Sequence, residues 1–190
     1  MNLNIENRIY AFTKIIEKTL ITNEGNVIKL NDGLDLFFDF LFSVKKNKGN
    51  LFIIGNGGSA GVASHAATDF FNVAKLKVFT LHESSLITCF SNDYGYEHVF
   101  AKQINQLMQK KDMLIAISSS GNSSNIRNAV DEAKKKQATV ITLSGFKKNN
   151  PLRNMGNLNI WLDSCDYGFV EIGHQFLLHN IADRFNPIFK

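Results

Sequence analysis

The stretch GNGGSAGVASHAATDF, residues 55–70, is the part of the chain that decides the fold. It follows the short apolar run LFII at residues 51–54 and leads into residues with helical spacing. Glycines between a strand and a helix let the backbone approach a phosphate at the helix N-terminus. The stretch therefore predicts a strand, a glycine-rich turn and a helix, the repeating unit of a parallel α/β sheet.

The glycines alone do not identify the phosphate. Residues 55–60 match G-x-G-x-x-A, a variant of the dinucleotide fingerprint, which also needs an acidic residue about 20 positions later to hold a ribose. Position 75 is Lys, and the nearest candidate, Glu83, is too distant. No Lys-Ser/Thr pair follows the glycines, which excludes the triphosphate-binding P-loop.

The rest of the chain repeats the alternation of strand and helix. Four further apolar runs have strand length, at residues 78–81, 113–117, 138–143 and 158–162. Helical spacing covers residues 60–71, 97–109, 126–136 and 167–185, and Pro187 closes the last helix. Runs that are apolar at consecutive positions are typical of strands buried on both faces. We therefore expect a three-layer α-β-α sandwich around a five-stranded parallel sheet.

The first fifty residues have a different pattern. Residues 9–21 and 33–46 both carry apolar residues at three- and four-residue spacing, which predicts two N-terminal helices. The segment between them, TNEGNVIKLND, has the composition of a turn. We expect one domain over residues 1–190, with a helical segment at 1–48 and the α/β core at 49–190.

Composition narrows the class of protein. The 190 residues are 44% hydrophobic and 20% charged, and the net charge of +4 favours anionic ligands without indicating a nucleic acid partner. No apolar stretch reaches 18 residues and the N-terminus lacks a signal core, so we expect no membrane association. The two cysteines suit a reducing cytoplasm, and we expect Cys89 and Cys165 to be buried or half-buried thiols.

In such a sheet, ligands bind beyond the carboxyl ends of the strands. The segment SSSGNSS follows the third apolar run and precedes a helix, with serines at 118, 119, 120, 123 and 124. Hydroxyls and free N–H groups at a helix N-terminus suit a phosphate monoester. A serine-rich N-cap is the alternative, but a cap needs one serine and this segment has five. The residues Asn92-Asp93-Tyr94-Gly95 have the composition of a turn.

Two expected helices each carry a His and a carboxylate. His65 and Asp69 share one helix face, and the last helix has Glu171, Gln175 and His179 in one row with His174 offset from it. Two imidazoles and two carboxylates form a plausible divalent-metal set or an acid–base set. The alternative, a helix pair of purely structural surface residues, stays open at this point.

Four motifs in order, GNGGSAGVASH, NDYGYEHVFAKQI, SSSGNSSNIRNAVDEAKKKQATVITLSG and VEIGHQFLLH, resemble the phosphoheptose (sedoheptulose 7-phosphate) isomerase group of sugar isomerase (SIS) domain proteins. The similarity covers roughly residues 51–185. The resemblance implies the SIS fold, a cytoplasmic homotetramer with active sites at subunit interfaces, and a zinc or other divalent-metal site. It also implies an aldose–ketose isomerase that converts sedoheptulose 7-phosphate to a heptose 7-phosphate for surface-glycan heptose biosynthesis.

The resemblance also assigns residues. The sugar phosphate is expected to bind Ser118, Ser119, Ser120 and Ser123, with Asn56, Gly57, Ser59, Asp93 and Glu171 facing the substrate. The metal is expected on His65, Asp69, Glu171 and His179, with Asp69 as the carbon base and His179 as its acid–base partner. Asp69 stands where the family usually has Glu, and Glu171 where it has Gln. Val73 stands where it often has Arg, and Gly168 where it often has Asp.

Two other functions remain open at this stage. One is an isomerase for a different phosphosugar. The other is a non-catalytic SIS module that binds a phosphosugar or a protein, as in a relative that assists replication initiation.

Overall fold

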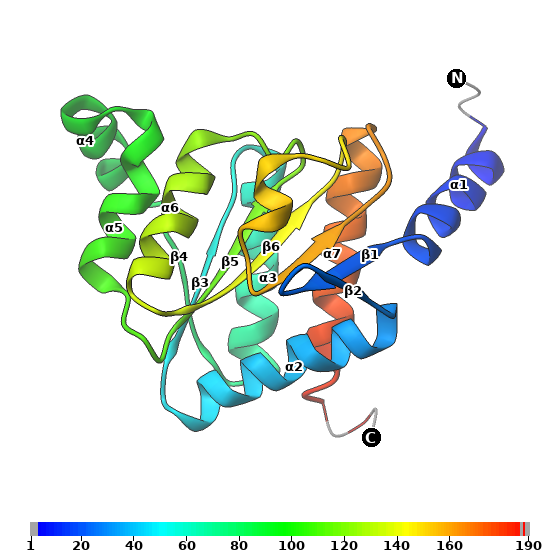
Figure 1. Ribbon diagram of the computed structural model, residues 1–190, viewed down its shortest axis with the longest axis horizontal. Coiled ribbons are helices and arrows are strands. Elements are labelled where there is room, and N and C mark those ends of the chain that lie inside the picture. Colours follow the sequence, from blue (N-terminus) through cyan, green and yellow to red (C-terminus); the bar gives the residue numbers. More distant parts are fainter. Residues whose placement is uncertain (1–3, 187, 189–190) are drawn as a thin grey trace.

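The computed structural model describes residues 4–186 and 188, which form one seven-stranded sheet with helices on both faces (Figure 1). The strand order is β2-β1-β7-β6-β5-β3-β4. The strands are β1 (Leu20–Asn23), β2 (Asn26–Ile28), β3 (Asn50–Ile54), β4 (Lys77–Thr80), β5 (Met113–Ser118), β6 (Thr139–Ser144) and β7 (Leu158–Trp161). The α-helices are α1 (Ile5–Glu17), α2 (Leu30–Lys46), α3 (Gly58–Asn72), α4 (Ser84–Tyr94), α5 (Val99–Leu107), α6 (Ser124–Lys135) and α7 (Tyr167–Asp183), and the short 3₁₀ helices are η1 (Tyr96–His98) and η2 (Pro151–Asn154).

The five expected parallel strands are all present, as β4-β3-β5-β6-β7. The central strand β5 is buried along its whole length, which explains its continuous apolar sequence. Helices α2, α3 and α7 pack on one face of the sheet and α5 and α6 on the other, so two apolar layers enclose it. The predicted three-layer sandwich is therefore confirmed.

The sheet is larger than expected, because the predicted turn at residues 22–32 contains a β-hairpin. Strand β1 pairs antiparallel with β7 and carries β2 as the edge strand. Glu24 and Gly25, both at positive φ (48° and 84°), make the two-residue connection that such hairpins favour. The prediction of helix at residues 20–21 was wrong, since α1 ends at Glu17 and Ile21 is buried in the sheet.

The second departure lies after β4. The predicted turn at Asn92–Gly95 begins only at Gly95 (φ 86°), because the three residues before it form the last turn of helix α4. Both cysteines are exposed, contrary to the expectation of buried thiols. The expected stop at Pro187 lies outside the described residues.

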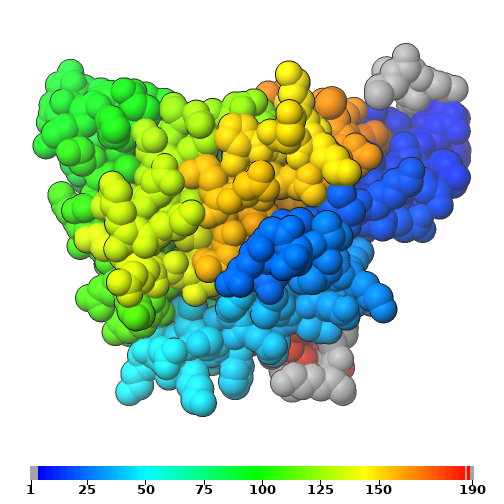
Figure 2. Space-filling model, in the orientation of Figure 1, coloured from blue at the N-terminus to red at the C-terminus, as the bar shows by residue number. Residues whose placement is uncertain are grey.

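Helix α1 lies at the periphery of the protein, where Phe12 packs on Phe169 and Phe176 of α7 and Ile15 and Ile16 touch the core. None of its described residues is buried, and in Figure 2 it projects at one edge of the molecule. Its Ile9 and Tyr10 are 60% and 67% exposed. Among the described helices, none is both long enough and apolar enough to cross a bilayer.

Candidate active site

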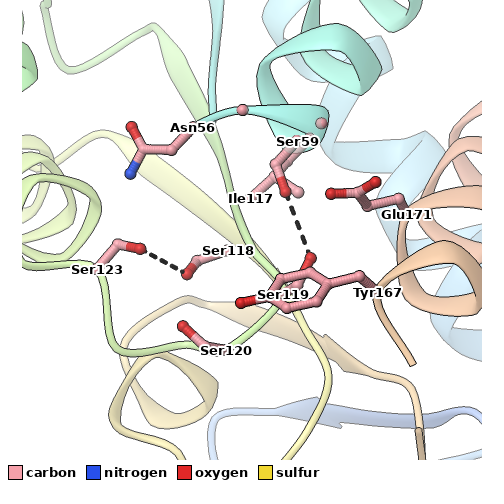
Figure 3. A pocket seen from close by; sticks show the side chains of 11 residues that line it. Asn56, Ser59, Ile117, Ser118, Ser119, Ser120, Ser123, Tyr167 and Glu171 are labelled. Carbon is pink, nitrogen blue, oxygen red and sulfur yellow. Dashed lines mark hydrogen bonds between the residues drawn. The ribbon is translucent and has the colours of Figure 1, made fainter. Parts of the chain in front are cut away.

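A pocket opens where the carboxyl ends of β3 and β5 lead into helices α3 and α6 (Figure 3). Its volume is about 240 Å³. It is lined by Asn56, Gly57, Gly58, Ser59, Ile117, Ser118, Ser119, Ser120, Ser123, Tyr167 and Glu171. The fold therefore gathers eight of the nine expected substrate contacts around one cavity.

Both helices that begin at the pocket have N-termini without a side-chain cap, in the part of the chain that the structure describes. Gly57 at the start of α3 has no side chain, and Ser123 at the start of α6 makes no capping hydrogen bond. Helices α2 and α5, both within the described residues, also lack a side-chain cap, so α3 and α6 are distinguished by where they begin, at the pocket. The N–H of Ile126 in α6 already donates to Asn125 Oδ1 at 3.0 Å. The N–H groups before it and two positive helix ends face the same cavity, which favours an anionic ligand.

The serine hydroxyls face the cavity rather than the helix end. Ser118 Oγ donates to Ser123 Oγ at 3.1 Å, and the hydroxyls of Ser59 and Ser119 lie 3.5 Å apart across the pocket. Of the described residues that line the pocket, none is Lys or Arg. A phosphate here would be held by hydroxyls and amides, as the sequence predicted, and the simple N-cap interpretation does not fit Ser123.

The Asn56 side chain is fixed by its neighbours. Its amide exchanges two hydrogen bonds of 2.9 Å with the buried Asn125, and Tyr96 Oη donates to its Oδ1 at 3.2 Å. Behind it, His82 Nε2 donates to the carbonyl of Gly55 at 3.0 Å. Burial lowers the pKa of His82, and the hydrogen bond to Gly55 partly opposes that shift.

Glu171 brings a negative charge into the same pocket. Its carboxylate lies directly over Gly58, where a Cβ would overlap it. A carboxylate at the first turn of a helix is favoured by the helix dipole. Glu171 would repel the phosphate of a ligand. We therefore expect the phosphate to bind beside the serines at α6, with the sugar directed toward Glu171.

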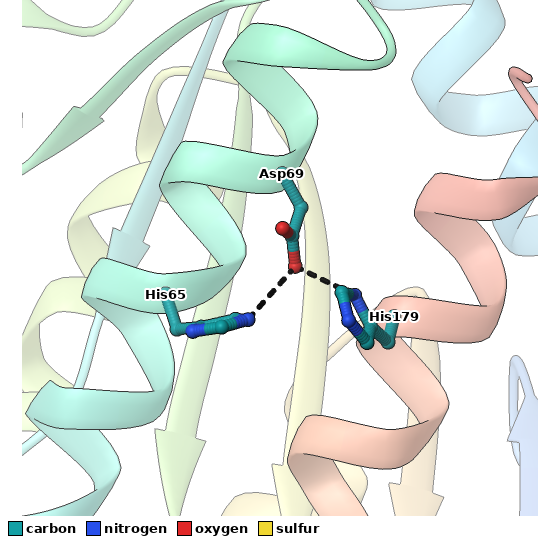
Figure 4. Close-up of side chains that lie close together, drawn as sticks. All are labelled: His65, Asp69 and His179. Carbon is teal, nitrogen blue, oxygen red and sulfur yellow. Dashed lines mark ion pairs between the residues drawn. The ribbon is translucent and has the colours of Figure 1, made fainter.

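A second group lies further along the same two helices (Figure 4). Asp69 Oδ2 is 2.8 Å from His179 Nδ1 and 3.4 Å from His65 Nε2. Candidate ligand atoms of the three residues all lie within 4.8 Å of one another. Asp69 Oδ2 is buried and has no hydrogen-bond partner among residues 4–186 and 188, although two imidazoles face it. An oxygen in this setting fits a cation bound between the three side chains.

The structure separates Glu171 from this His–Asp–His group. Glu171 lies beside Gly58 and His179 beside Asp69, so α3 and α7 run side by side in the same direction. Seven residues separate Gly58 from His65 along α3, which is about 10 Å of helix. One chain therefore holds the pocket and the His–Asp–His group at two positions along the same helix pair.

Asp93, the ninth expected substrate contact, lies outside the pocket lining. It sits in the last turn of α4, where its carboxylate accepts a 2.9 Å hydrogen bond from Asn92 Nδ2. Residues that the sequence did not single out are Gly58, Ile117 and Tyr167 in the lining, and Asn125 and Tyr96 behind Asn56. The sequence did hold a signal for Tyr167. This residue begins the last helix soon after a strand ends, and ligands of such a sheet bind at that edge.

Comparison with known proteins supplies independent findings. The sequence profile of the SIS domain family matches residues 12–145. A phosphoheptose isomerase from Campylobacter concisus is 33% identical, over 91% of this chain and 98% of that protein. A second from Helicobacter pylori is 32% identical, over 94% of this chain and 92% of that protein.

Solved structures agree with the sequence relatives. The phosphoheptose isomerase of Neisseria gonorrhoeae superposes with a TM-score of 0.81 at 26% identity, covering 96% of this chain and 98% of that one. The structure of a phosphoheptose isomerase from Francisella tularensis gives a TM-score of 0.83 at 26% identity, covering 96% of both chains.

Proposed function

This chain belongs to the SIS domain family and, within it, to the phosphoheptose isomerases, and from that premise we propose how its residues act. It is a phosphosugar isomerase of heptose biosynthesis, and its reaction interconverts an aldose and a ketose. The substrate that we propose is sedoheptulose 7-phosphate. The observation that carries the proposal is the serine-lined pocket between two uncapped helix ends, on the helix that also bears Asp69.

In this proposal the pocket holds the phosphate and the adjoining part of the sugar. Ser118, Ser119, Ser120 and Ser123 bind the phosphate together with the first N–H groups of α6. Asn56, Gly57, Ser59 and Glu171 face the sugar hydroxyls. Binding the unreactive phosphate fixes the position of the reacting carbons, so its binding energy serves orientation.

At the reacting end of the sugar, one group must remove a proton from carbon and a second group must move a proton between the oxygens. We assign the first role to Asp69, which takes the proton from C1 of the ketose and returns it to C2 of the enediol. His179, 2.8 Å from Asp69, moves the proton between the two oxygens. Asp69 Oδ2 faces the imidazoles, which leaves Oδ1 to meet the carbon proton.

We further propose that a divalent metal, zinc by family resemblance, binds His65, Asp69 and His179. The unpaired buried Oδ2 of Asp69 and the convergent imidazole nitrogens support this assignment. When bound, the metal would supply Lewis-acid stabilisation of negative charge on the enediol oxygens. Glu171 was expected as a fourth ligand, and it can serve only if its side chain turns away from Gly58.

Assembly is the third part of the proposal. We propose a homotetramer in which neighbouring copies complete each active site and bring Asp93 to the substrate. Two observations support it. Asp93 does not line the pocket of its own chain. Large apolar side chains are also exposed on α1 and α7, namely Ile5, Ile9, Tyr10, Tyr167, Ile172 and Phe176.

We place the reaction in the cytoplasm, where sugar phosphates are the metabolic form of sugars, and in a pathway that feeds a surface glycan such as lipopolysaccharide or capsule. Two exposed free thiols, Cys89 and Cys165, are compatible with a reducing compartment.

The deciding experiment incubates the purified protein with sedoheptulose 7-phosphate and follows the products by NMR. We expect an aldoheptose 7-phosphate to appear, with exchange of solvent deuterium at the migrating position. Binding of the sugar phosphate without any product would instead indicate a non-catalytic SIS module. Light scattering on the same sample tests the tetramer.

A further inference from the structure

Asn150 is a buried polar side chain that the proposed reaction does not use. It is 2% exposed and lies just before η2, in the connection from β6 to β7. Its Nδ2 lies within hydrogen-bond distance of three acceptors, Ser144 Oγ (3.2 Å), the carbonyl of Gly145 (3.1 Å) and that of Lys147 (2.9 Å). Its Oδ1 accepts from the N–H of Arg153 at 3.1 Å. One amide thus joins the start of this connection to the turn of η2.

The same connection holds the serine loop, defined as residues 118–123. The N–H of Gly145 donates to the carbonyl of Ser119 at 2.9 Å, and the N–H of Leu152 donates to that of Gly121 at 3.2 Å. Gly121 packs directly on the amide, because a Cβ at this position would overlap Asn150 Oδ1. Asn150 therefore lies under the loop and between its two backbone anchors.

The conformation of the connection is also unusual. Phe146 has a positive φ of 53°, which costs a non-glycine residue free energy and persists only where neighbouring contacts hold it. Its ring packs edge-on against Tyr167, with 4.7 Å between centroids, and Tyr167 lines the pocket. Asn150 bonds the carbonyls on both sides of Phe146, and the N–H of Phe146 donates to the carbonyl of Ser164 at 2.8 Å, so these contacts together hold the shape.

We propose that Asn150 is a positioning residue for phosphate binding: it holds the serine loop in the arrangement that receives the phosphate. The proposal rests on the proposed function, because it requires the serine loop to bind phosphate. Loss of the Asn150 amide would take its donor from Ser144 Oγ and remove the support beneath Gly121, whereas the carbonyls of Gly145 and Lys147 would each keep one other donor, Trp161 Nε1 and the N–H of residue 150. The hydroxyls and N–H groups around the phosphate would then lose their fixed geometry, whereas Asp69 and its imidazoles would be untouched.

The test compares Asn150→Ala with Asn159→Ala. Asn159 is similarly buried (3% exposed) and is also held by side-chain hydrogen bonds, to Thr142 Oγ1 and the backbone of Gly156. It lies two positions back along the sheet from the loop, in register with Thr142 and Ala116, and within the described residues none of its hydrogen bonds goes to residues 118–123. Binding of inorganic phosphate is measured by calorimetry, and KM and kcat are measured with sedoheptulose 7-phosphate. For Asn150→Ala we expect a tenfold or larger rise in both the phosphate Kd and KM, and a much smaller change in kcat.

For Asn159→Ala we expect a similar loss of melting temperature with unchanged phosphate binding. Equal phosphate affinity in the two variants would overturn the positioning role. If Asn150→Ala does not fold, Asn150→Ser takes its place in the test. Serine retains one donor, so we expect a smaller rise in the phosphate Kd and in KM. A wild-type protein that binds neither phosphate nor the sugar phosphate would refute the phosphate site itself and this role with it.

A double-mutant cycle separates direct support from general destabilisation. Gly121→Ala should weaken phosphate binding in the wild-type background, where the new Cβ meets Asn150. In the Asn150→Ala background the same change should cost less, because Oδ1 and Cγ of Asn150 are gone and only its Cβ stays close to the new methyl group. The strain of a non-glycine residue at positive φ is common to both backgrounds, so it cancels in the coupling energy. Strictly additive effects on the phosphate Kd would contradict the contact proposed here.

Discussion

Asp69→Asn is the substitution that tests the proposed chemistry most directly. The side chain keeps its size but loses the negative charge and most of its capacity to take a proton. Removing a positioned general base costs about 10²- to 10⁴-fold in rate. This range corresponds to about 3–5 kcal/mol in the activation free energy.

The effect on folding should be far smaller. The two imidazoles that face Asp69 are 56% and 52% exposed, so solvent screens both ion pairs. Pairs of this kind contribute about 0–1 kcal/mol to the free energy of unfolding. In a domain of this size that is at most about 2–4 °C in melting temperature. Activity should therefore collapse while the protein remains folded.

The assay measures turnover of sedoheptulose 7-phosphate by NMR, with melting temperature and bound zinc measured on the same samples. Asp131→Asn, an exposed aspartate on α6, is the matched control and should be neutral. His65→Asn removes a proposed metal ligand but leaves the base, so added zinc should restore part of its activity. Asp69→Asn should not be restored. A folded Asp69→Asn protein within fivefold of wild-type turnover would refute the assignment of the base.

Three further predictions follow from the pocket and its surroundings. Ser119→Ala should raise the Kd for inorganic phosphate about 10- to 150-fold, since a hydrogen bond to a charged group is worth about 1.5–3 kcal/mol. An unchanged Kd, measured by calorimetry, would show that Ser119 does not bind the phosphate. Gly58→Ala should displace the Glu171 carboxylate and raise KM. The free energy of unfolding should change by no more than about 1 kcal/mol, because the gain in helix propensity offsets the lost contact between the carboxylate and the helix dipole. An unchanged KM would show that Glu171 does not face the sugar. Full burial lowers the pKa of His174 from 6.5 to about 4, so the unfolded chain takes up its proton first as pH falls. His174 contributes roughly 3 kcal/mol to the free energy of unfolding above pH 6.5, and this contribution is lost as the pH falls from about 6.5 to 4. His174→Gln should therefore make the free energy of unfolding depend less on pH over that window. The same pH dependence in the variant and the wild type would contradict this.

The fold was predictable where burial is continuous. The central strands could be read from the sequence because a strand covered on both faces is apolar at consecutive positions, as β5 is from Met113 to Ile117. The edge strand β4 is only half covered, and its short apolar run at residues 78–81 was enough to find it. The hairpin could not be read, because Leu20 and Ile21 continue the helical spacing of α1 and the two strands have only four and three residues. Helix α4 was missed because it has no buried residue and hence no clear apolar face.

The candidate site was predictable at the level of segments but not of side-chain direction. Position after a strand was enough to find Asn56 and the serines, because the topology brings those strand ends together. Helical spacing placed Glu171 and His179 on one face of α7, yet it could not show that Glu171 turns to Gly58 while His179 meets Asp69. The absence of a side-chain cap on α6 is likewise a property of geometry, because Ser123 is a residue type that usually caps a helix.

The hairpin formed by β1 and β2 has a consequence for the order in which the chain folds. Leu20, near the start of the chain, pairs with Trp161, near its end, so the hairpin of β1 and β2 cannot join the sheet until β7 has been synthesised. Contacts so distant in sequence form late, because closing a long loop costs entropy before the contact repays it. We expect the five parallel strands to assemble first, and the N-terminal segment, with its buried Ile21, to join as the closing step of folding.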